Sequence, residues 1–158
     1  MFRPMRRIKQ RLSEAECVEL LTRQPRGVLA VLGDDAYPYA LPLDFYYDPG
    51  SGRLYFHCAR EGHKLDAIRR HDKVSFCIMD EGFCREGEWA LNIRSVIVFG
   101  AMRIVEDREK ALEMVLRLGE KYYPDPQEAA EELRKAADRV VCLELIPAHI
   151  SGKLVNES

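Results

Sequence analysis

Residues 37–58 read YPYALPLDFYYDPGSGRLYFHC, and this stretch decides the fold class. Aromatic or aliphatic side chains occupy every second position of its first half, at Tyr37, Tyr39, Leu41, Leu43, Phe45 and Tyr47. This alternation is typical of a strand with one buried face. A turn-forming segment, residues 48–52, follows, and the alternation then resumes at Leu54, Phe56 and Cys58. The sequence therefore predicts an antiparallel β-hairpin.

Further helices and strands are predicted on both sides of this hairpin. Ser13 and Glu16 form a capping box, so a helix is expected from there to just before Pro25. Residues 80–89 are expected to form a loop, and Pro147 to lead into a short extended tail. The remaining helices are predicted at residues 62–70, 112–119 and 129–137, and the remaining strands at residues 28–32, 74–79, 93–105 and 140–146.

The order of these elements favours a mainly β fold. Short hairpins join consecutive strands, whereas the helices lie at both ends of the chain and in one crossover. A doubly wound parallel sheet would instead alternate strands and helices throughout. We expect an antiparallel sheet closed, or nearly closed, into a β-barrel with flanking helices, as one domain over residues 1–158. Gly100, inside a strand, predicts a bulge or a close backbone approach.

The composition is typical of a soluble globular protein. Of the 158 residues, 47% are hydrophobic and 32% are charged, and the formal net charge is −2. A near-neutral chain has no general attraction to nucleic acid or to an anionic membrane, and no apolar run is long enough to span a membrane. The five cysteines form no CxxC pair, which favours reduced thiols in the cytoplasm over disulfides or a zinc site. We expect a cytoplasmic protein.

Residues 1–12 form a basic arm, in which five cations precede the first acid, Glu14. These cations are Arg3, Arg6, Arg7, Lys9 and Arg11. We expect the arm to be solvated or to grip a partner subunit, and nucleic-acid binding is the less favoured alternative.

A candidate phosphate site lies where an apolar strand gives way to Gly62, His63 and Lys64, at the start of a predicted helix. The first N–H groups of a helix are unpaired and lie at the positive end of its dipole, so this turn suits a phosphate. Lys64 adds a charge, and a protonated His63 would add a donor, in which case binding would weaken as the pH rises. The alternative is that both are ordinary solvated residues, although the dipole opposes cations there.

Four segments together resemble a known family. They are residues 37–43 (YPYALPL), 55–59 (YFHCA), 62–66 (GHKLD) and 94–100 (RSVIVFG). In order and spacing they are similar to the pyridoxamine 5′-phosphate oxidase-related FMN-binding proteins, and most similar to the nitroimidazole-resistance branch. The resemblance runs over residues 2–153. It implies an FMN-binding split β-barrel and a homodimer with FMN sites at the subunit interface.

The resemblance also implies which residues bind FMN. Nine positions match the family's cofactor-binding residues: Leu41, Pro42, Leu43, His57, Cys58, Ala59, His63, Lys64 and Ser95. The backbone of residues 41–43 would lie along the isoalloxazine ring, and Pro42, which has no N–H, fits a sheet edge. Residues 57–59 would follow the ribityl chain towards a phosphate held at residues 63–64. Ser95 would approach from the second subunit.

Three departures from the oxidases affect the predicted activity. His63 replaces an arginine, so the site lacks the two parallel hydrogen bonds that a guanidinium can donate to a phosphate. Ser95 replaces a longer glutamine. The oxidases end with an arginine and a histidine that bind the substrate phosphate, but no arginine follows Arg139 here. We therefore do not expect a true pyridoxamine phosphate oxidase.

The favoured function is an FMN-dependent oxidoreductase that takes electrons from NAD(P)H and reduces a small flat acceptor such as a nitroaromatic. No catalytic acid is identified. The alternative is a non-catalytic flavin- or haem-binding module, with His57 or His149 as a haem ligand. The four histidines lack zinc-type spacing, so no metal site is predicted. Phe83 and Trp89 could roof a flat ligand or pack at a dimer interface.

Overall fold

The computed structural model describes residues 1–157, and α1 begins at the predicted capping box. The Ser13 hydroxyl accepts a hydrogen bond from the Glu16 amide, and the Glu16 carboxylate accepts one from the Ser13 amide. In chain order the elements are η1 (Ile8–Gln10), α1 (Glu14–Arg23), β1 (Arg26–Leu32), η2 (Asp34–Ala36), β2 (Pro38–Asp44), β3 (Tyr46–Asp48), β4 (Arg53–Ala59), α2 (His63–Arg70), β5 (Lys73–Met79), β6 (Phe83–Cys84), β7 (Leu91–Ile104), α3 (Arg108–Tyr122), α4 (Pro126–Ala136) and β8 (Val140–Glu157).

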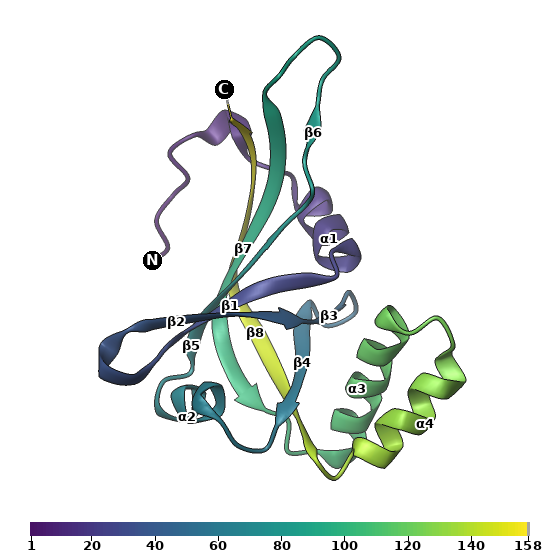
Figure 1. Cartoon of the computed structure of the whole chain (residues 1–158). Helices are drawn as coiled ribbons and strands as arrows, with labels where there is room; N and C mark the ends of the chain where they lie inside the picture. The colour runs from purple at the N-terminus through teal and green to yellow at the C-terminus, as the bar shows by residue number, and fades with distance from the viewer. Residues whose placement is uncertain (158) are drawn as a thin grey trace.

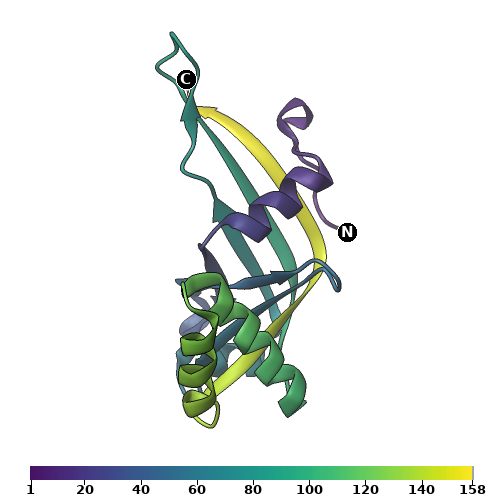
Figure 2. The same ribbon diagram turned by 90° about the vertical axis from the view of Figure 1, so that its right-hand side faces the viewer.

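Within residues 1–157 the strands form one antiparallel sheet. Its order is β2-β1-β5-β7-β8-β4-β3, and β6 pairs with the start of β7. The two longest strands, β7 and β8, pair along most of their length and curl together, which bends the sheet into a half-barrel (Figure 1, Figure 2). The predicted fold class, a mainly β barrel-like sheet with flanking helices, is confirmed.

Helices cover both surfaces of the curled sheet. The helices α1 and α2 each bury one apolar face in the core inside the curl. The α3–α4 hairpin packs on the outer surface of β4 and β8, where Met114 and Val115 meet Tyr55 and Cys142. None of the helices in residues 1–157 has both the length and the apolar run needed to cross a membrane.

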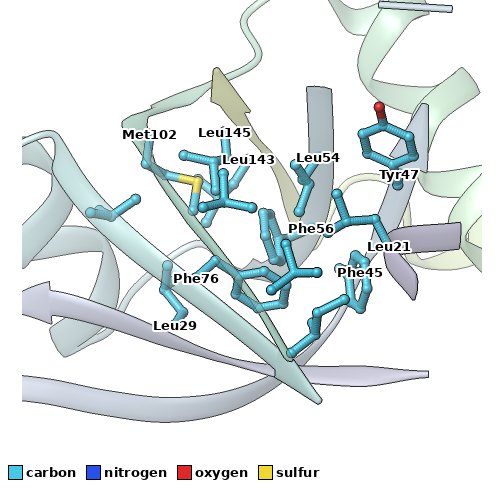
Figure 3. Packing of buried hydrophobic residues seen from close by; sticks show 14 of the residues in the cluster. Leu21, Leu29, Phe45, Tyr47, Leu54, Phe56, Phe76, Met102, Leu143 and Leu145 are labelled. Carbon is cyan, nitrogen blue, oxygen red and sulfur yellow. The ribbon is translucent and has the colours of Figure 1, made fainter. Parts of the chain in front are cut away.

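Three phenylalanines from different parts of the chain form the centre of the inner core. Phe76 meets Phe45 and Phe56 edge to face, with ring centroids 5.0 and 5.1 Å apart, and none of the three is exposed. Aliphatic side chains such as Leu21 and Leu143 surround them (Figure 3). Edge-to-face pairs add about 0.5–1.5 kcal/mol each to the stabilisation from burial.

The half-barrel is open along one seam, which lies between β2 and the end of β4. Among the described strands, β2 pairs only with β1, and β3 pairs only with residues 53–55 of β4. The chain crosses this opening at Phe45, the single residue between β2 and β3. The end of α3 holds the crossing: the Phe45 amide donates to the Tyr122 hydroxyl (2.9 Å), and the Lys121 ammonium donates to the Phe45 carbonyl (3.0 Å).

The alternation over residues 37–47 is therefore divided between two strands. β2 and β3 lie at opposite ends of the sheet order, so the chain must turn at Phe45, and the buried ring keeps the period-two pattern intact across the break. The predicted loop at residues 80–89 also differs, because Phe83 and Cys84 pair with Asn92 and Leu91.

The last strand is much longer than predicted. Instead of ending at residue 146, β8 continues through Pro147 to Glu157, so the expected tail is part of the sheet. Pro147 is tolerated because it lies opposite Gly100, at the register shift in β7 where the hydrogen-bond ladder is irregular. Gly100 is the predicted close approach, since a Cβ there would collide with the carbonyl oxygen of Ile146.

Candidate functional site

A pocket of about 360 Å³ spans the seam between β2 and β4. It is lined by Arg26, Pro42, Leu43, Asp44 and His57. The first four residues lie on β1 and β2, whereas His57 lies on β4. This volume falls at the lower end of the range for ligand sites. The fold thus brings Pro42, Leu43 and His57, predicted from separate segments, to one opening, which we call the seam pocket.

β2 forms one wall of the seam pocket and is an edge strand, as expected for Pro42. Leu41 and Leu43 pack against the core from the inner face, whereas Pro42 lies on the outer face and is exposed. The backbone groups of β2 that point away from β1 have no strand partner within residues 1–157. A ligand in the seam pocket could hydrogen-bond to them.

His57 is a buried polar group that the fold leaves unsatisfied. Its Nδ1 atom is buried and has no hydrogen-bond partner in the described part of the chain. Burial lowers the pKa of His57, while the Asp44 carboxylate raises it and the Lys64 ammonium lowers it; the ring is therefore neutral near pH 7. A buried nitrogen without a partner costs about 1–3 kcal/mol. A ligand that supplied the missing partner would recover that cost.

The end of β4 presents its backbone to the seam. His57, Cys58 and Ala59 pair with β8 on one side, while β3 covers the other side only as far as Tyr55. Burial raises the pKa of the Cys58 thiol, although Lys64 and Arg69 lower it. Cys58 is therefore a neutral thiol at pH 7, which does not favour a nucleophilic role.

Gly62 is the N-cap of α2, where the sequence predicted a phosphate site. Gly62 has a φ of 139°, a conformation that favours glycine, and no atom would meet a Cβ there within 4 Å. Lys64 is half-buried, and its ammonium has no carboxylate within 4.0 Å among residues 1–157. Its charge acts on both His57 and Cys58. Lys64 is thus an uncompensated cation beside the seam.

His63 is already engaged within the protein. Its Nε2 accepts a hydrogen bond of 3.2 Å from the Asp34 amide, and its ring stacks on Tyr39 at 4.3 Å. The Asp34 carboxylate lies 3.6 Å from the same nitrogen, but a nitrogen that accepts from an amide carries no proton. His63 therefore fastens α2 to the turn after β1, and only its Nδ1 remains to donate to a ligand.

Ser95, Phe83 and Trp89 do not reach the seam pocket of their own chain. Ser95 lies on β7, three strands from β2 in the sheet order, which corresponds to roughly 14 Å. Phe83 and Trp89 are exposed at the far end of β7, around β6. Any role of these residues at a seam pocket would require a second copy of the chain.

An apolar surface, which we call the outward face, covers the outer side of the middle strands. Strand pairing places Pro42, Val28, Cys77 and Ile97 in one row across β2, β1, β5 and β7. Val28 and Ile97 are 40% and 38% exposed, which is high for large apolar side chains in a sheet. Ser95 lies two residues along β7 from Ile97, on the same face.

The basic N-terminal arm lies against this outward face. Phe2 stacks on both Phe99 and His149, with centroid distances of 5.6 and 4.8 Å. Further along, Arg11 pairs with Lys153 of β8. The face of the His149 ring is therefore covered by an aromatic side chain of the same chain.

The ion pair between Arg26 and Asp44 is part of the seam pocket but was not predicted. Arg26 Nε lies 2.7 Å from the Asp44 carboxylate, across the β1–β2 pair. Only the register of the two strands brings these charges together. Within residues 1–157 no three His, Cys, Asp or Glu side chains gather in an arrangement that could hold a metal ion.

Comparison with known families gives one match that spans most of the chain. Residues 13–154 match the family model described as pyridoxamine 5′-phosphate oxidase. No curated protein matches the sequence.

Several solved structures share the fold. A candidate 5-nitroimidazole antibiotic resistance protein from Bacteroides thetaiotaomicron is 16% identical, over 92% of this chain and 87% of that chain, with a TM-score of 0.78. An FAD-binding protein from Mesorhizobium loti is 24% identical over 92% and 97% of the two chains, with a TM-score of 0.64. An FAD and haem binding protein from Mycobacterium smegmatis is 22% identical over 92% and 73%, with a TM-score of 0.73.

Proposed function

Because the chain belongs to the pyridoxamine 5′-phosphate oxidase family, as its motifs predicted, we propose that its seam pocket binds a flavin nucleotide. Two structures with the same fold are named for FAD, and one of them also for haem. The observation that carries the proposal is the buried, unpartnered Nδ1 of His57 in the wall of the seam pocket. A flavin ring or its ribityl hydroxyls offer the donors and acceptors that this nitrogen lacks.

The residues around the seam fit the FMN portion of such a cofactor. The free edge of β2 at residues 41–43 would bind the ring system, and the open backbone at residues 57–59 would face the ribityl chain. The phosphate would lie at the start of α2, against the uncompensated charge of Lys64 and the free amides near Gly62. His63 would add one donor, Nδ1, since its other nitrogen is occupied.

The site would be completed by a second copy of the chain. We propose a homodimer through the outward face, which carries exposed apolar side chains on β1, β5 and β7. Ser95 shares that face with Pro42, so a two-fold arrangement could bring Ser95 of one subunit to the seam pocket of the other. Contiguous exposed apolar surfaces often mark sites of protein–protein contact.

The proposed activity is electron transfer from NAD(P)H to a small flat acceptor such as a nitroaromatic. A bound flavin would supply the redox chemistry, and the protein would supply orientation and hydrogen bonds. The neutral His57 would hydrogen-bond to the cofactor, while the Arg26–Asp44 pair would border the space open to the acceptor.

The absorption spectrum of the purified protein, with mass identification of the released cofactor, tests the proposal. Flavin bands are expected. A Soret band without flavin would favour the haem-binding alternative, and a colourless protein that cannot be loaded with FMN or FAD would refute the site.

Two substitutions locate the cofactor. Lys64→Ala should weaken flavin binding by about 1.5–3 kcal/mol, the value of a charge-assisted contact, and His57→Leu should weaken it by about 1–2 kcal/mol. Lys73→Ala, which removes an exposed lysine on β5, is the matched control and should leave the affinity unchanged. Equal affinity in Lys64→Ala and the control would mean that the phosphate lies elsewhere.

A further inference from the structure

A second and larger cavity, of about 840 Å³, lies under the α3–α4 hairpin, and we call it the helix groove. Its lining comes from the end of β7, the first turns of α3, the end of α4 and the start of β8. The floor is apolar and includes Val105, Leu112, Val115 and Val140. The volume is typical of a site for a drug-sized or nucleotide-sized ligand. Nothing in the proposed flavin site uses this cavity.

The helix groove begins where the proposed flavin phosphate would lie. One of its walls is Arg60, two residues before Gly62, and another is Arg69, whose charge acts on Cys58 together with that of Lys64. Val140, Val141 and Cys142 line the groove and pair directly with residues 57–59 of β4. A ligand that extends from a phosphate bound at residues 62–64 would therefore enter the groove beside Arg60 and Arg69.

The charges along the helix groove are arranged unevenly. Arg60 has no carboxylate within 4.0 Å in the described chain, and the contact of Arg69 with Asp66 is long, at 3.7 Å. Glu106, just before α3, and Glu109, in its first turn, also line the groove. Arg108 and Asp138 line it as well and pair with each other at 3.4 Å. The groove thus offers two weakly compensated cations near the phosphate turn, and an apolar floor with carboxylates beyond them.

Cations followed by an apolar floor and carboxylates suit a nucleoside that is joined to the flavin phosphate through a second phosphate. We propose that the helix groove binds the adenosine monophosphate half of FAD, so that the cofactor of this protein is the dinucleotide and not FMN. Arg60 and Arg69 would hold the second phosphate, Glu106 or Glu109 would accept from the ribose hydroxyls, and the apolar floor would contact the adenine. The inference rests on the proposed function, because the FMN half must occupy the seam pocket.

Titration of the full chain, stripped of cofactor, with FMN, FAD and ADP tests this inference. FAD should bind at least about tenfold more tightly than FMN. Arg60→Ala should weaken FAD about 10–100-fold but FMN less than about twofold. Arg23→Ala, an exposed arginine at the end of α1, is the matched control and should change neither. Leu112→Trp, which fills the apolar floor, should selectively weaken FAD; if it does not fold, Arg60→Ala alone decides.

The outcomes separate the two proposals. Equal affinity for FMN and FAD, or an equal loss of both in Arg60→Ala, overturns the groove assignment but leaves the seam pocket as a flavin site. If neither flavin binds, the proposed function fails, and the titration with ADP then tests whether the helix groove binds an adenine nucleotide. ADP binding that Arg60→Ala weakens would keep the groove as an adenylate site, whereas absence of ADP binding would overturn it.

Discussion

The carboxylate of Glu144 on β8 is buried beneath three cations, and replacing it with glutamine should destabilise the fold strongly. Its side chain is 4% exposed and accepts hydrogen bonds from Lys110 (2.6 Å), Arg53 (2.8 Å), Arg103 (3.0 Å) and the Tyr55 hydroxyl (3.0 Å). Glu144→Gln keeps the shape but removes the only negative charge among these contacts. The network joins α3, β4 and β7 to β8, so the loss affects the docking of the helix hairpin.

The magnitude follows from the exposure of the partners. Breaking a fully buried ion pair from one side costs about 3–5 kcal/mol. Here Arg53 and Lys110 are 34% and 35% exposed and Arg103 is 59% exposed, so water can partly solvate the stranded cations. We therefore expect a loss of about 2–4 kcal/mol in the free energy of unfolding, measured by urea denaturation at pH 7.

The pH dependence gives an independent test. Burial alone would raise the pKa of Glu144, but the hydrogen bonds from its cationic partners outweigh burial and lower it from 4.5 to about 2. Between these two values the unfolded chain binds more protons than the native protein, so the stability contributed by Glu144 is complete above about pH 5 and declines as the pH falls towards 2. It should amount to about 1–3 kcal/mol after allowance for solvent screening.

Glu113→Gln is the control, because it breaks only an exposed pair with Arg117 on α3. It should cost less than about 0.5 kcal/mol. Glu144 does not have the assigned role if Glu144→Gln matches this control at pH 7, or if the variant loses stability between pH 5 and 2 as steeply as the wild-type protein does.

Two further predictions concern the interface and the phosphate turn. Ile97→Asp places a charge in the outward face, so it should convert the proposed dimer to monomers in sedimentation experiments while changing the urea midpoint little; a dimer that persists would show that subunits meet elsewhere. His63→Ala should weaken flavin binding less than Lys64→Ala does, because Nε2 of His63 already accepts a hydrogen bond from the Asp34 amide. An equal loss of affinity in the two variants would instead make His63 as strong a phosphate ligand as Lys64.

The fold class was predictable because its local signals agree with its packing. The capping box at Ser13 and the close approach at Gly100 each act within a few residues and are found as predicted. The alternation from Tyr37 onwards correctly indicates β structure, although two strands share it. The break at Phe45 and the continuation of β8 beyond Pro147 were not predictable in this way. Both depend on which strand lies alongside, and a sequence pattern does not contain that information.

The candidate site shows the same division. The β4–α2 turn was visible as a glycine followed by a histidine and a lysine, and the edge position of Pro42 followed from its missing N–H. The engagement of His63 with Asp34 and the pairing of Arg26 with Asp44 bring together residues 29 and 18 positions apart, and nothing local indicates either. Glu144 likewise looks like an ordinary strand carboxylate until β4, β7 and α3 place cations around it.

Because the end of α3 holds the chain crossing at Phe45, the position of α3 affects the width of the seam pocket. Phe45 alone joins β2 to β3 at the opening. The Lys121 ammonium donates both to the Phe45 carbonyl (3.0 Å) and to the Gln24 carbonyl at the end of α1 (2.7 Å). Burial lowers the pKa of Lys121 to about 8, so the ammonium that bridges these carbonyls is held close to its titration point. Substitutions at Lys121, which lines no part of the seam pocket, should therefore still change how tightly that pocket binds a ligand.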